Sequence, residues 1–234
     1  MSQSRIPEKA SDTDCVTRPS SVLKGMERLE RLGSDSAVPK NFIVIEPGVV
    51  PDCCYVVKKG RVIVFDYTPH GEARVYDLME ERSLFLEANL LTNTPSYAYF
   101  KTTMPSELVC IGREALLLAL REDPALMSGV IESIAYKFLS SVDQIKQSRS
   151  YTTTWKVCNL LLTFADRFGA PYDGKTLIRE KISQRMISNF LGINRVTTVR
   201  IFKDLKDLNL IEQINGYYCI RDTTKLKQHM KSIG

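Results

Sequence analysis

The segment from Ile182 to Ile211 holds the side chains whose types and spacing most clearly serve a chemical purpose. Arg195 and Arg200 follow a turn that contains Gly192. A guanidinium group carries five donors in a fixed fork, so it can donate two parallel hydrogen bonds to a guanine edge or to a phosphate. The spacing therefore predicts a polyanion-binding surface on the second of two short helices.

The same segment has the apolar pattern of two short helices joined by a tight turn. Ser183 is placed to cap the first helix, and Asn194 is placed to cap the second. The residues expected to pack inward on the second helix are Val199, Phe202 and Leu205, with Ile201 and Leu208 beside them. Two helices arranged in this way form a helix-turn-helix, whose second helix enters the major groove of DNA.

Two β-prone runs follow and flank Asn215-Gly216, the strongest short signal for a β-hairpin. A helix-turn-helix followed by a hairpin predicts a winged helix. Residues 151–234 carry 14 basic and 7 acidic side chains, whereas residues 1–150 carry 18 and 20. This basic excess favours DNA binding over an unrelated pair of hairpins. The predicted DNA-binding residues are Lys181, Ser183, Asn194, Arg195, Val196, Thr197, Thr198, Arg200, Lys203 and Arg221.

The elements before this module fall into two groups. Residues 41–111 form short β-prone runs separated by turn residues, the pattern of a sandwich or barrel-like roll. A short helix over 114–121 and a long amphipathic helix of about six turns follow. Such a helix needs a partner: it can lie on the β-roll, pair with a second copy of itself, or do both. The residues predicted for contact with a second copy are Val130, Ile134, Phe138, Val142 and Ile145.

The predicted fold class is α+β, with four regions. They are a flexible tail and short helix (1–35), a β-roll that senses an effector (36–122), a long dimerisation helix with a polar hinge (123–150), and a winged-helix DNA-binding domain (151–234). The longest apolar run has six residues, whereas a membrane-spanning helix needs about 20. We therefore expect a cytoplasmic protein without a membrane partner.

Metal and enzyme chemistry have little support in the sequence. The chain has six cysteines, none spaced C-x-x-C, and only His70 and His229 as histidines. We expect no haem, no iron–sulfur cluster and no other metal centre, and a cupin-like metalloenzyme would need clustered histidines. A redox switch stays open as an alternative. In it, one of Cys15, Cys53, Cys54 and Cys110 pairs with Cys158 or Cys219.

From about residue 36 onward the chain resembles the Crp–Fnr superfamily of cyclic-AMP receptor proteins and fumarate–nitrate regulators. The spacing matches without a gap from Ile182 to Ile211, including Gly192, Arg195 and the run 209–211. The order of roll, long helix and winged helix matches as well. The resemblance implies a homodimeric bacterial transcription regulator of palindromic DNA, controlled by a small molecule, a metal centre or a redox event at the roll. RNA polymerase is a further partner that the resemblance allows.

The chain departs from the cyclic-nucleotide binders of this family. Their cassette reads Gly-Glu-Leu followed by Arg-Ser, whereas this chain has Leu86-Glu87-Ala88 and Ser96-Tyr97. Without the guanidinium, a phosphate loses a charge-assisted contact, and Glu87 is expected to face it with no compensating cation. These departures disfavour cAMP. Val196 replaces a glutamate of the cyclic-AMP receptors and can contact a thymine methyl, which favours an A·T-rich site.

The remaining pattern resembles the branch of the family that senses aromatic acids and regulates halorespiration. Tyr97-Ala98 and Lys137 carry this resemblance. A lysine in a partly apolar pocket can pair with a phenolate or carboxylate, and tyrosines can stack on a ring. A solvated Lys137 and plain packing of the tyrosines are the alternatives. The candidate effector-binding residues are Glu87, Ser96, Tyr97, Tyr99, Tyr136, Lys137 and Ser141.

Overall fold

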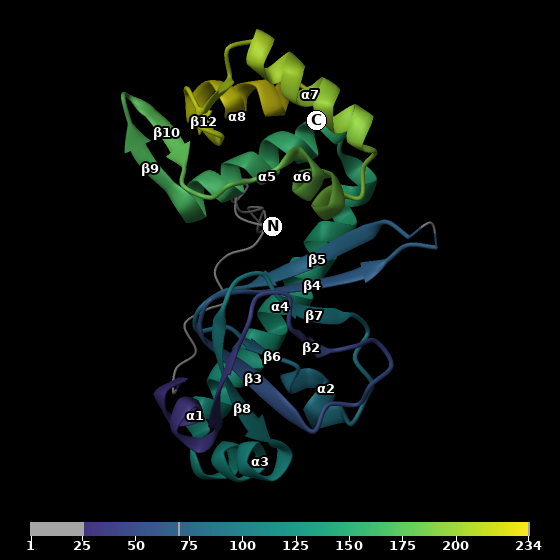
Figure 1. Ribbon diagram of the computed structural model, residues 1–234, viewed down its shortest axis with the longest axis vertical. Helices are drawn as coiled ribbons and strands as arrows, with labels where there is room; N and C mark the ends of the chain where they lie inside the picture. The colour runs from purple at the N-terminus through teal and green to yellow at the C-terminus, as the bar shows by residue number, and fades with distance from the viewer. Residues whose placement is uncertain (1–25, 70, 234) are drawn as a thin grey trace, which may run out of the picture.

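The computed structural model describes residues 26–69 and 71–233, and it confirms the predicted architecture (Figure 1). A β-roll is followed by a long helix and a winged helix-turn-helix domain. The flexible tail predicted for the N-terminus, Cys15 and His70 lie outside the described residues. Of the short helix predicted after the tail, the structure describes α1 (Met26–Leu32), which ends beside Gly33.

The roll consists of two four-stranded antiparallel sheets. The first has the order β1 (Ser34–Val38), β8 (Ser106–Gly112), β3 (Cys53–Lys59) and β6 (Leu84–Phe85). The second has the order β2 (Ile43–Ile45), β7 (Tyr99–Thr102), β4 (Val62–Tyr67) and β5 (Ala73–Met79). Alternating residues of β3 enter two different apolar clusters, because successive side chains of a strand point to opposite faces. The polar strand β1 and the two-residue strand β6 carried no readable sequence signal.

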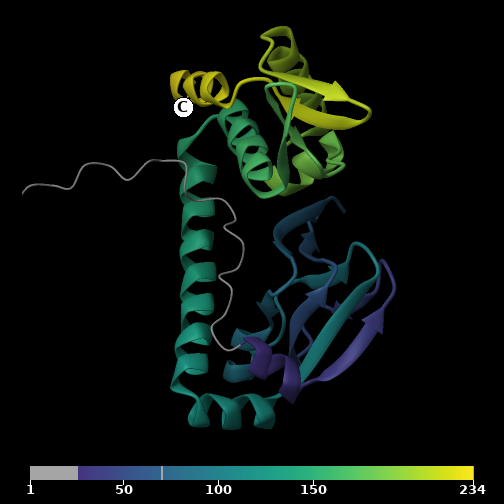
Figure 2. The ribbon, with the colours of Figure 1, turned by 90° about the vertical axis from the view of Figure 1, so that its left-hand side faces the viewer.

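Three helices follow or interrupt the strands of the roll. The short helix α2 (Glu87–Thr92) lies between β6 and β7, and α3 (Arg113–Glu122) follows β8. The long helix α4 (Pro124–Ser150) begins at Asp123, whose side chain accepts hydrogen bonds from the backbone N–H groups of Ala125 and Leu126. In Figure 2, α4 runs from the base of the roll to the C-terminal domain.

The hinge expected over residues 147–154 is much shorter in the structure. Because its residues 147–150 include neither proline nor glycine, α4 continues to Ser150, and only two residues separate it from α5 (Thr153–Phe168). The side chain of Thr152 accepts a hydrogen bond from the N–H of Trp155 and so caps α5. The two helices are therefore joined by a tight connection.

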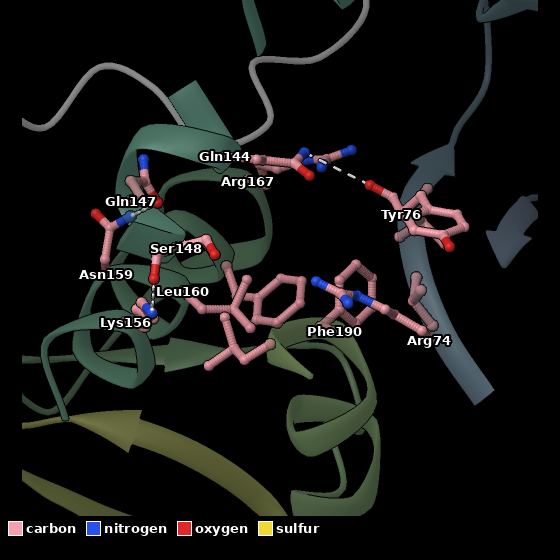
Figure 3. Close-up of a pocket in the computed structure, with 14 residues that line it drawn as sticks. Arg74, Tyr76, Gln144, Gln147, Ser148, Lys156, Asn159, Leu160, Arg167 and Phe190 are labelled. Carbon is pink, nitrogen blue, oxygen red and sulfur yellow. Dashed lines mark hydrogen bonds between the residues drawn. The ribbon is translucent and has the colours of Figure 1, made fainter. Parts of the chain in front are cut away.

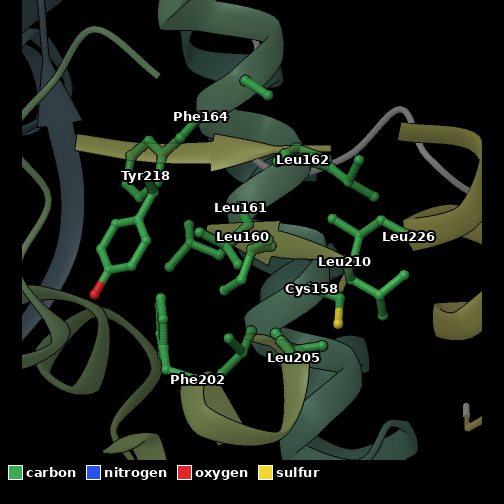
Figure 4. Packing of buried hydrophobic residues seen from close by; sticks show 14 of the residues in the cluster. Cys158, Leu160, Leu161, Leu162, Phe164, Phe202, Leu205, Leu210, Tyr218 and Leu226 are labelled. Atoms are coloured by element: carbon green, nitrogen blue, oxygen red, sulfur yellow. The ribbon is translucent and has the colours of Figure 1, made fainter. Parts of the chain in front are cut away.

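The C-terminal domain is built around α5, whose apolar side chains form the core seen in Figure 4. A four-stranded sheet has the order β11 (Ile211–Ile214), β12 (Tyr217–Ile220), β10 (Lys175–Ile178) and β9 (Gly169–Tyr172). Helices α6 (Gln184–Leu191), α7 (Arg195–Asp207) and α8 (Thr223–Ser232) complete the domain. The predicted hairpin turn has positive φ at both Asn215 and Gly216, as a two-residue hairpin turn requires.

Two features of the described residues concern membranes and metals. None of the helices in ranges 26–69 and 71–233 is long and apolar enough to cross a membrane. Across these ranges, no group of three or more His, Cys, Asp and Glu side chains is placed to hold a metal ion.

Candidate functional site

The helix-turn-helix is held in shape by two caps and one glycine. The hydroxyl oxygen of Ser183 accepts a hydrogen bond from the N–H of Met186 at 3.0 Å, and Oδ1 of Asn194 accepts one from the N–H of Val196 at 2.7 Å. Gly192 ends α6 with φ of 61°, in the left-handed region that glycine enters at little cost. Both predicted caps are therefore present, and they fix where α7 begins.

The outer face of α7 presents most, but not all, of the predicted DNA-binding side chains. Arg195, Val196, Arg200 and Lys203 are exposed, and Thr197 is half-buried. Their placement leaves two cationic forks and an exposed valine at the N-terminal half of the helix. Such a surface can contact base edges and phosphates in a major groove.

Two assignments on α7 are wrong. Thr198 is fully buried, and its hydroxyl donates a hydrogen bond to the Asn194 carbonyl oxygen at 3.2 Å, so it is not available to DNA. Val199 is 46% exposed, whereas Ile201 is buried in the domain core in its place. The inward face of α7 is narrow, so the apolar pattern of the sequence did not show which of several neighbouring positions is buried.

The two side chains predicted to contact phosphate near the wing, Arg221 and Lys181, differ in whether an acidic side chain pairs with them. Arg221 forms an ion pair with Glu212 at 2.6 Å, and Lys175 pairs with the other oxygen of the same carboxylate at 2.7 Å. Lys181 is exposed, with its ammonium 5.7 Å from the centre of the Tyr217 ring. Arg221 is therefore paired with Glu212, whereas Lys181 forms no ion pair with this carboxylate.

The long helix α4 has two apolar faces rather than one. Leu126 and Val130 are buried against the roll, and Ile134 packs partly against the same cluster. The opposite face exposes large apolar side chains at Met127, Ile131, Phe138, Leu139, Val142 and Ile145. In Figure 2 the roll lies along one side of α4, and the described elements leave the other side uncovered. We call this second set of six residues the exposed stripe.

This arrangement corrects the predicted dimer contact. Val130 is only 2% exposed and belongs to the core of its own chain, and Ile134 faces largely the same way. Phe138, Val142 and Ile145 do lie on the exposed stripe. The prediction merged the two faces because both repeat every three or four residues along one helix.

Lys137 and Glu87 form a buried ion pair where α4 crosses the roll. The Lys137 ammonium lies 2.5 Å from Oε1 of Glu87 and donates a second hydrogen bond to the Leu84 carbonyl oxygen at 2.6 Å. The Glu87 side chain is 2% exposed and that of Lys137 is 27% exposed. The expectation that Glu87 lacks a compensating cation is therefore wrong, and so is the picture of Lys137 as a solvated side chain.

The other predicted effector residues do not form a single site with this pair. The hydroxyl of Ser96 is buried and donates to the Ala98 carbonyl oxygen at 2.7 Å. Tyr99 stacks on Phe65 at 5.3 Å between ring centres. Ser141 is exposed and donates to the Lys137 carbonyl oxygen.

Tyr97 and Tyr136 differ in exposure. Tyr97 is 61% exposed, and Tyr136 is half-buried. Partial desolvation, followed by the nearby Asp77 and Glu87 carboxylates, raises the pKa of Tyr97 to about 12. Tyr97 is therefore a neutral phenol at physiological pH, able to donate as well as accept a hydrogen bond.

Stacked aromatic rings fill the inside of the roll beside these residues. Tyr55 stacks on Phe85 at 5.3 Å, and Phe85 stacks on Phe100 at 5.4 Å. Tyr97 continues the series from Phe100, and Tyr76 lies 6.2 Å beyond Tyr97. The rings link the first sheet of the roll to the outer end of the second.

The roll and the winged helix meet through a cluster of charges that the sequence did not predict. The guanidinium of Arg61 donates two hydrogen bonds to Glu180, at 3.1 and 3.2 Å, and lies 3.4 Å from Glu80. Arg167 pairs with the same Glu80, and both guanidiniums lie over the ring of Phe168. We call these five residues the junction cluster. Arg61 and Glu180 are 119 positions apart, so no local pattern reveals their contact.

A cavity of about 130 Å³ lies beside the junction cluster (Figure 3). It is lined from β5, the end of α4, α5 and α6, so both domains contribute to it. Phe164, Leu160 and Phe190 supply apolar walls, and Arg74 reaches in from β5 toward Phe190. None of the predicted effector residues lines this cavity.

The cysteines of the described residues lie in three different surroundings. The sulfur atoms of Cys53 and Cys110, on the adjacent strands β3 and β8, are 2.6 Å apart, and both side chains are half-buried. Cys54 points to the opposite face of the sheet and is fully buried. Cys158 and Cys219 are fully buried within the C-terminal domain. The burial of Cys158 and Cys219 disfavours their predicted pairing with Cys53, Cys54 or Cys110, since neither thiol reaches the surface of its domain. The alternative that involves Cys15 lies outside the described residues.

The sequence matches two described protein families. Residues 36–123 match the cyclic nucleotide-binding domain, and residues 156–229 match the Crp-like helix-turn-helix domain. Among curated proteins, the chain is 26% identical to the global nitrogen regulator of Nostoc sp. over 174 residues, which is 74% of this chain and 78% of that protein. It is 20% identical to the CRP-like cAMP-activated global transcriptional regulator of Mycobacterium tuberculosis, over 82% of this chain and 86% of that protein.

Solved structures share the fold over nearly the whole chain. A CprK variant complexed with OCPA superposes with a TM-score of 0.72 at 16% identity, covering 91% of this chain and all of that one. The c-di-GMP responsive global regulator CLP of Xanthomonas campestris has a TM-score of 0.74, also at 16% identity, covering 85% of this chain and 98% of that one. At this level of identity the likeness establishes the fold and not the ligand.

Proposed function

Since the chain belongs to the Crp/Fnr family of transcription regulators, we propose that it binds palindromic DNA as a homodimer under the control of a small organic effector. The observation that carries DNA binding is the outer face of α7, where Arg195 and Arg200 are exposed behind a capped N-terminus. Such a regulator meets its DNA in the cytoplasm. RNA polymerase remains a predicted partner.

The proposed dimer forms through the exposed stripe of α4. Its six apolar side chains are spaced by three, four or seven residues along α4, apart from the adjacent Phe138 and Leu139, which is the pattern by which two helices pack side by side. A symmetric pair of α4 helices relates the two winged helices by a two-fold axis. Operator binding then requires the two α7 helices to lie about 34 Å apart, one turn of DNA.

The proposed effector region lies where the roll meets α4. The similar proteins include a cAMP-activated regulator, a c-di-GMP responsive regulator and a CprK variant complexed with OCPA, so the fold accepts chemically different effectors. In this chain an acidic ligand near Tyr97 competes with Glu87 for the Lys137 ammonium. Binding then changes how α4 sits on the roll and selects one arrangement of the two α7 helices.

Fluorescence anisotropy on a labelled A·T-rich palindrome from upstream of the gene tests this proposal. We expect Arg195→Ala to weaken binding by about 10- to 100-fold, the usual effect of removing one base-reading arginine. Arg121→Ala is the matched control, because Arg121 is exposed on α3, far along the chain from α7. Equal affinity of the Arg195→Ala variant and the unmodified protein contradicts DNA recognition by α7.

A second candidate mode of control is oxidation of the Cys53–Cys110 pair. A disulfide requires a sulfur–sulfur bond of about 2.05 Å, and the two sulfurs are already 2.6 Å apart. Burial and the hydrogen bond with Cys53 raise the pKa of Cys110 to about 12. We therefore assign the first attack on a peroxide to Cys53, which gives a sulfenic acid and water. Cys110 then displaces a second water, so two thiols and one hydrogen peroxide give one disulfide and two waters.

Peptide mapping after exposure to hydrogen peroxide tests this second candidate. We expect a linked peptide pair containing Cys53 and Cys110, which Cys53→Ser abolishes. Cys54→Ser is the matched control, since Cys54 is adjacent in sequence but buried on the other face of the sheet. If both thiols stay free, or if the link survives in the Cys53→Ser variant, control by this pair is wrong.

A further inference from the structure

We propose that the cavity between the two domains is a binding site for a small organic anion with a single ring, separate from the Lys137 region of the roll. The cavity measures about 130 Å³. A protein cavity of about 150 Å³ with apolar walls accepts benzene, so this space fits one six-membered ring. The proposal goes beyond the proposed effector region, because it needs no ligand near Glu87 or Lys137.

The lining of the cavity favours a negative charge on the ligand. Arg74, Lys156 and Arg167 contribute to it, and the described residues that line it include no Asp or Glu. Arg167 is occupied by Glu80, and the Lys156 ammonium donates to the Ser148 carbonyl oxygen at 2.8 Å. Arg74 forms no ion pair with another described residue, and its guanidinium faces the cavity (Figure 3). We assign Arg74 as the donor to a ligand carboxylate.

The apolar walls supply the rest of the recognition. Phe164 and Phe190 lie on α5 and α6, and their rings are 6.0 Å apart and nearly perpendicular. An aromatic ring in this space packs against one face and one edge, the geometries that aromatic pairs prefer. An anion without a ring gains only the contact with Arg74.

The site lies between the roll and the helix-turn-helix, which gives it a regulatory role. Arg74 lies against the turn of the helix-turn-helix, since a side chain placed at Gly192 would come within 3.5 Å of its guanidinium. Phe190 and Leu191 belong to α6, whereas Arg74 belongs to the roll. A ligand that touches both domains binds well only while they keep this relative placement. It therefore stabilises this placement over others.

Isothermal titration calorimetry of the full chain with sodium phenylacetate tests the proposal. Phenylacetate combines one ring with one carboxylate. Phenylacetamide, which is neutral, and acetate, which lacks the ring, serve as matched ligands. We expect phenylacetate to bind with one site per chain and both other compounds to bind at least tenfold more weakly.

Variants then locate the site. We expect Arg74→Ala to weaken phenylacetate binding at least tenfold and Arg74→Lys to restore part of the affinity. Because Arg74 is exposed, we expect both variants to fold, and circular dichroism of each variant checks this. Arg121→Ala is the matched control on the roll side. The double variant Glu87→Leu with Lys137→Leu, which leaves no unpaired buried charge, reports on the roll region.

Two results overturn the proposal. One is the absence of phenylacetate binding at millimolar concentrations. The other is binding that Arg74→Ala leaves unchanged. Loss of binding in the double variant Glu87→Leu with Lys137→Leu, with binding kept in Arg74→Ala, places the ligand in the roll, which removes the cavity site and leaves the proposed function intact. Loss of DNA binding in Arg195→Ala concerns only the proposed function.

Discussion

At the scale of single residues, the most informative side chain is Glu87, a carboxylate that is 2% exposed. A charge removed from water in this way requires a partner, and Lys137 supplies it from another element, 50 positions along the chain. The partner also ties the cassette region of the roll to α4. A ligand that draws Lys137 away from Glu87 leaves a buried carboxylate without its cation. Ligand binding can therefore change how α4 packs on the roll.

We predict that Lys137→Ala destabilises the protein by about 3–5 kcal/mol, because it leaves Glu87 buried without a cation. The double variant Glu87→Leu with Lys137→Leu is expected to recover most of this loss, since both charges are gone. Urea unfolding followed by circular dichroism measures each free energy. Lys58→Ala is the control, because its ion pair with Asp35 is exposed and little change is expected. A Lys137→Ala variant as stable as the control contradicts the buried pair.

At the scale of elements, α4 serves two partners at once. One face completes the core of the roll, and the exposed stripe carries six large apolar side chains with 39–66% exposure. An isolated helix face of this kind is costly in water, so a second copy of the chain is its expected cover.

We predict that Phe138→Glu converts the protein to a monomer at micromolar concentration, because it places a charge in the centre of the exposed stripe. Sedimentation velocity measures the change. Leu118→Glu is the matched control, since Leu118 is 56% exposed but lies on α3. An unchanged dimer in the Phe138→Glu variant rules out the exposed stripe as the interface.

The wing provides a prediction on pH. The hydrogen bond from Lys175, followed by that from Arg221, lowers the pKa of Glu212 below its usual 4.5. The stabilisation from this carboxylate is therefore present above pH 4.5 and disappears as pH falls through the lowered value. Glu212→Gln should melt at lower temperature than the unmodified protein at pH 7, with the difference vanishing in acid. If the difference in melting temperature stays constant from pH 7 down into acid, the stabilising role of the ionised Glu212 is contradicted.

At the scale of the whole molecule, the junction cluster decides how the two domains face each other. Arg61 pairs with acids on both sides, Glu80 in the roll and Glu180 in the C-terminal domain. The guanidiniums of Arg61 and Arg167 both lie over the Phe168 ring, 5.2 and 5.4 Å from its centre. Since the proposed anion site lies beside this cluster, the same contacts set its shape.

We predict that Arg61 and Glu180 are energetically coupled by about 0.5–3 kcal/mol in a double-mutant cycle of Arg61→Ala and Glu180→Gln. Hydrogen exchange of Arg61→Ala should show faster exchange in β5 and α6, where the domains meet. Arg28→Ala is the control, because its pairs with Glu122 and Asp123 lie at the other end of the roll. Additive effects of the two substitutions would show that the domains are placed by other contacts.

The sequence by itself determined the elements whose signals are local. Ser183, Gly192 and Asn194 set the ends of α6 and α7, and Asn215-Gly216 sets the wing, because caps and tight turns depend on residues within a few positions of one another. These signals sufficed for the fold class and for most of the predicted DNA-binding face.

Only the tertiary structure decided which faces and charges meet. Periodicity shows that a helix has apolar faces but not what covers them, so Val130 and Phe138 were predicted for one interface, although Val130 is buried in the roll core and Phe138 is exposed. The pairs Glu87–Lys137, Arg61–Glu180 and Cys53–Cys110 join residues 50 to 119 positions apart. Their contact depends on how the chain packs, which no local spacing encodes.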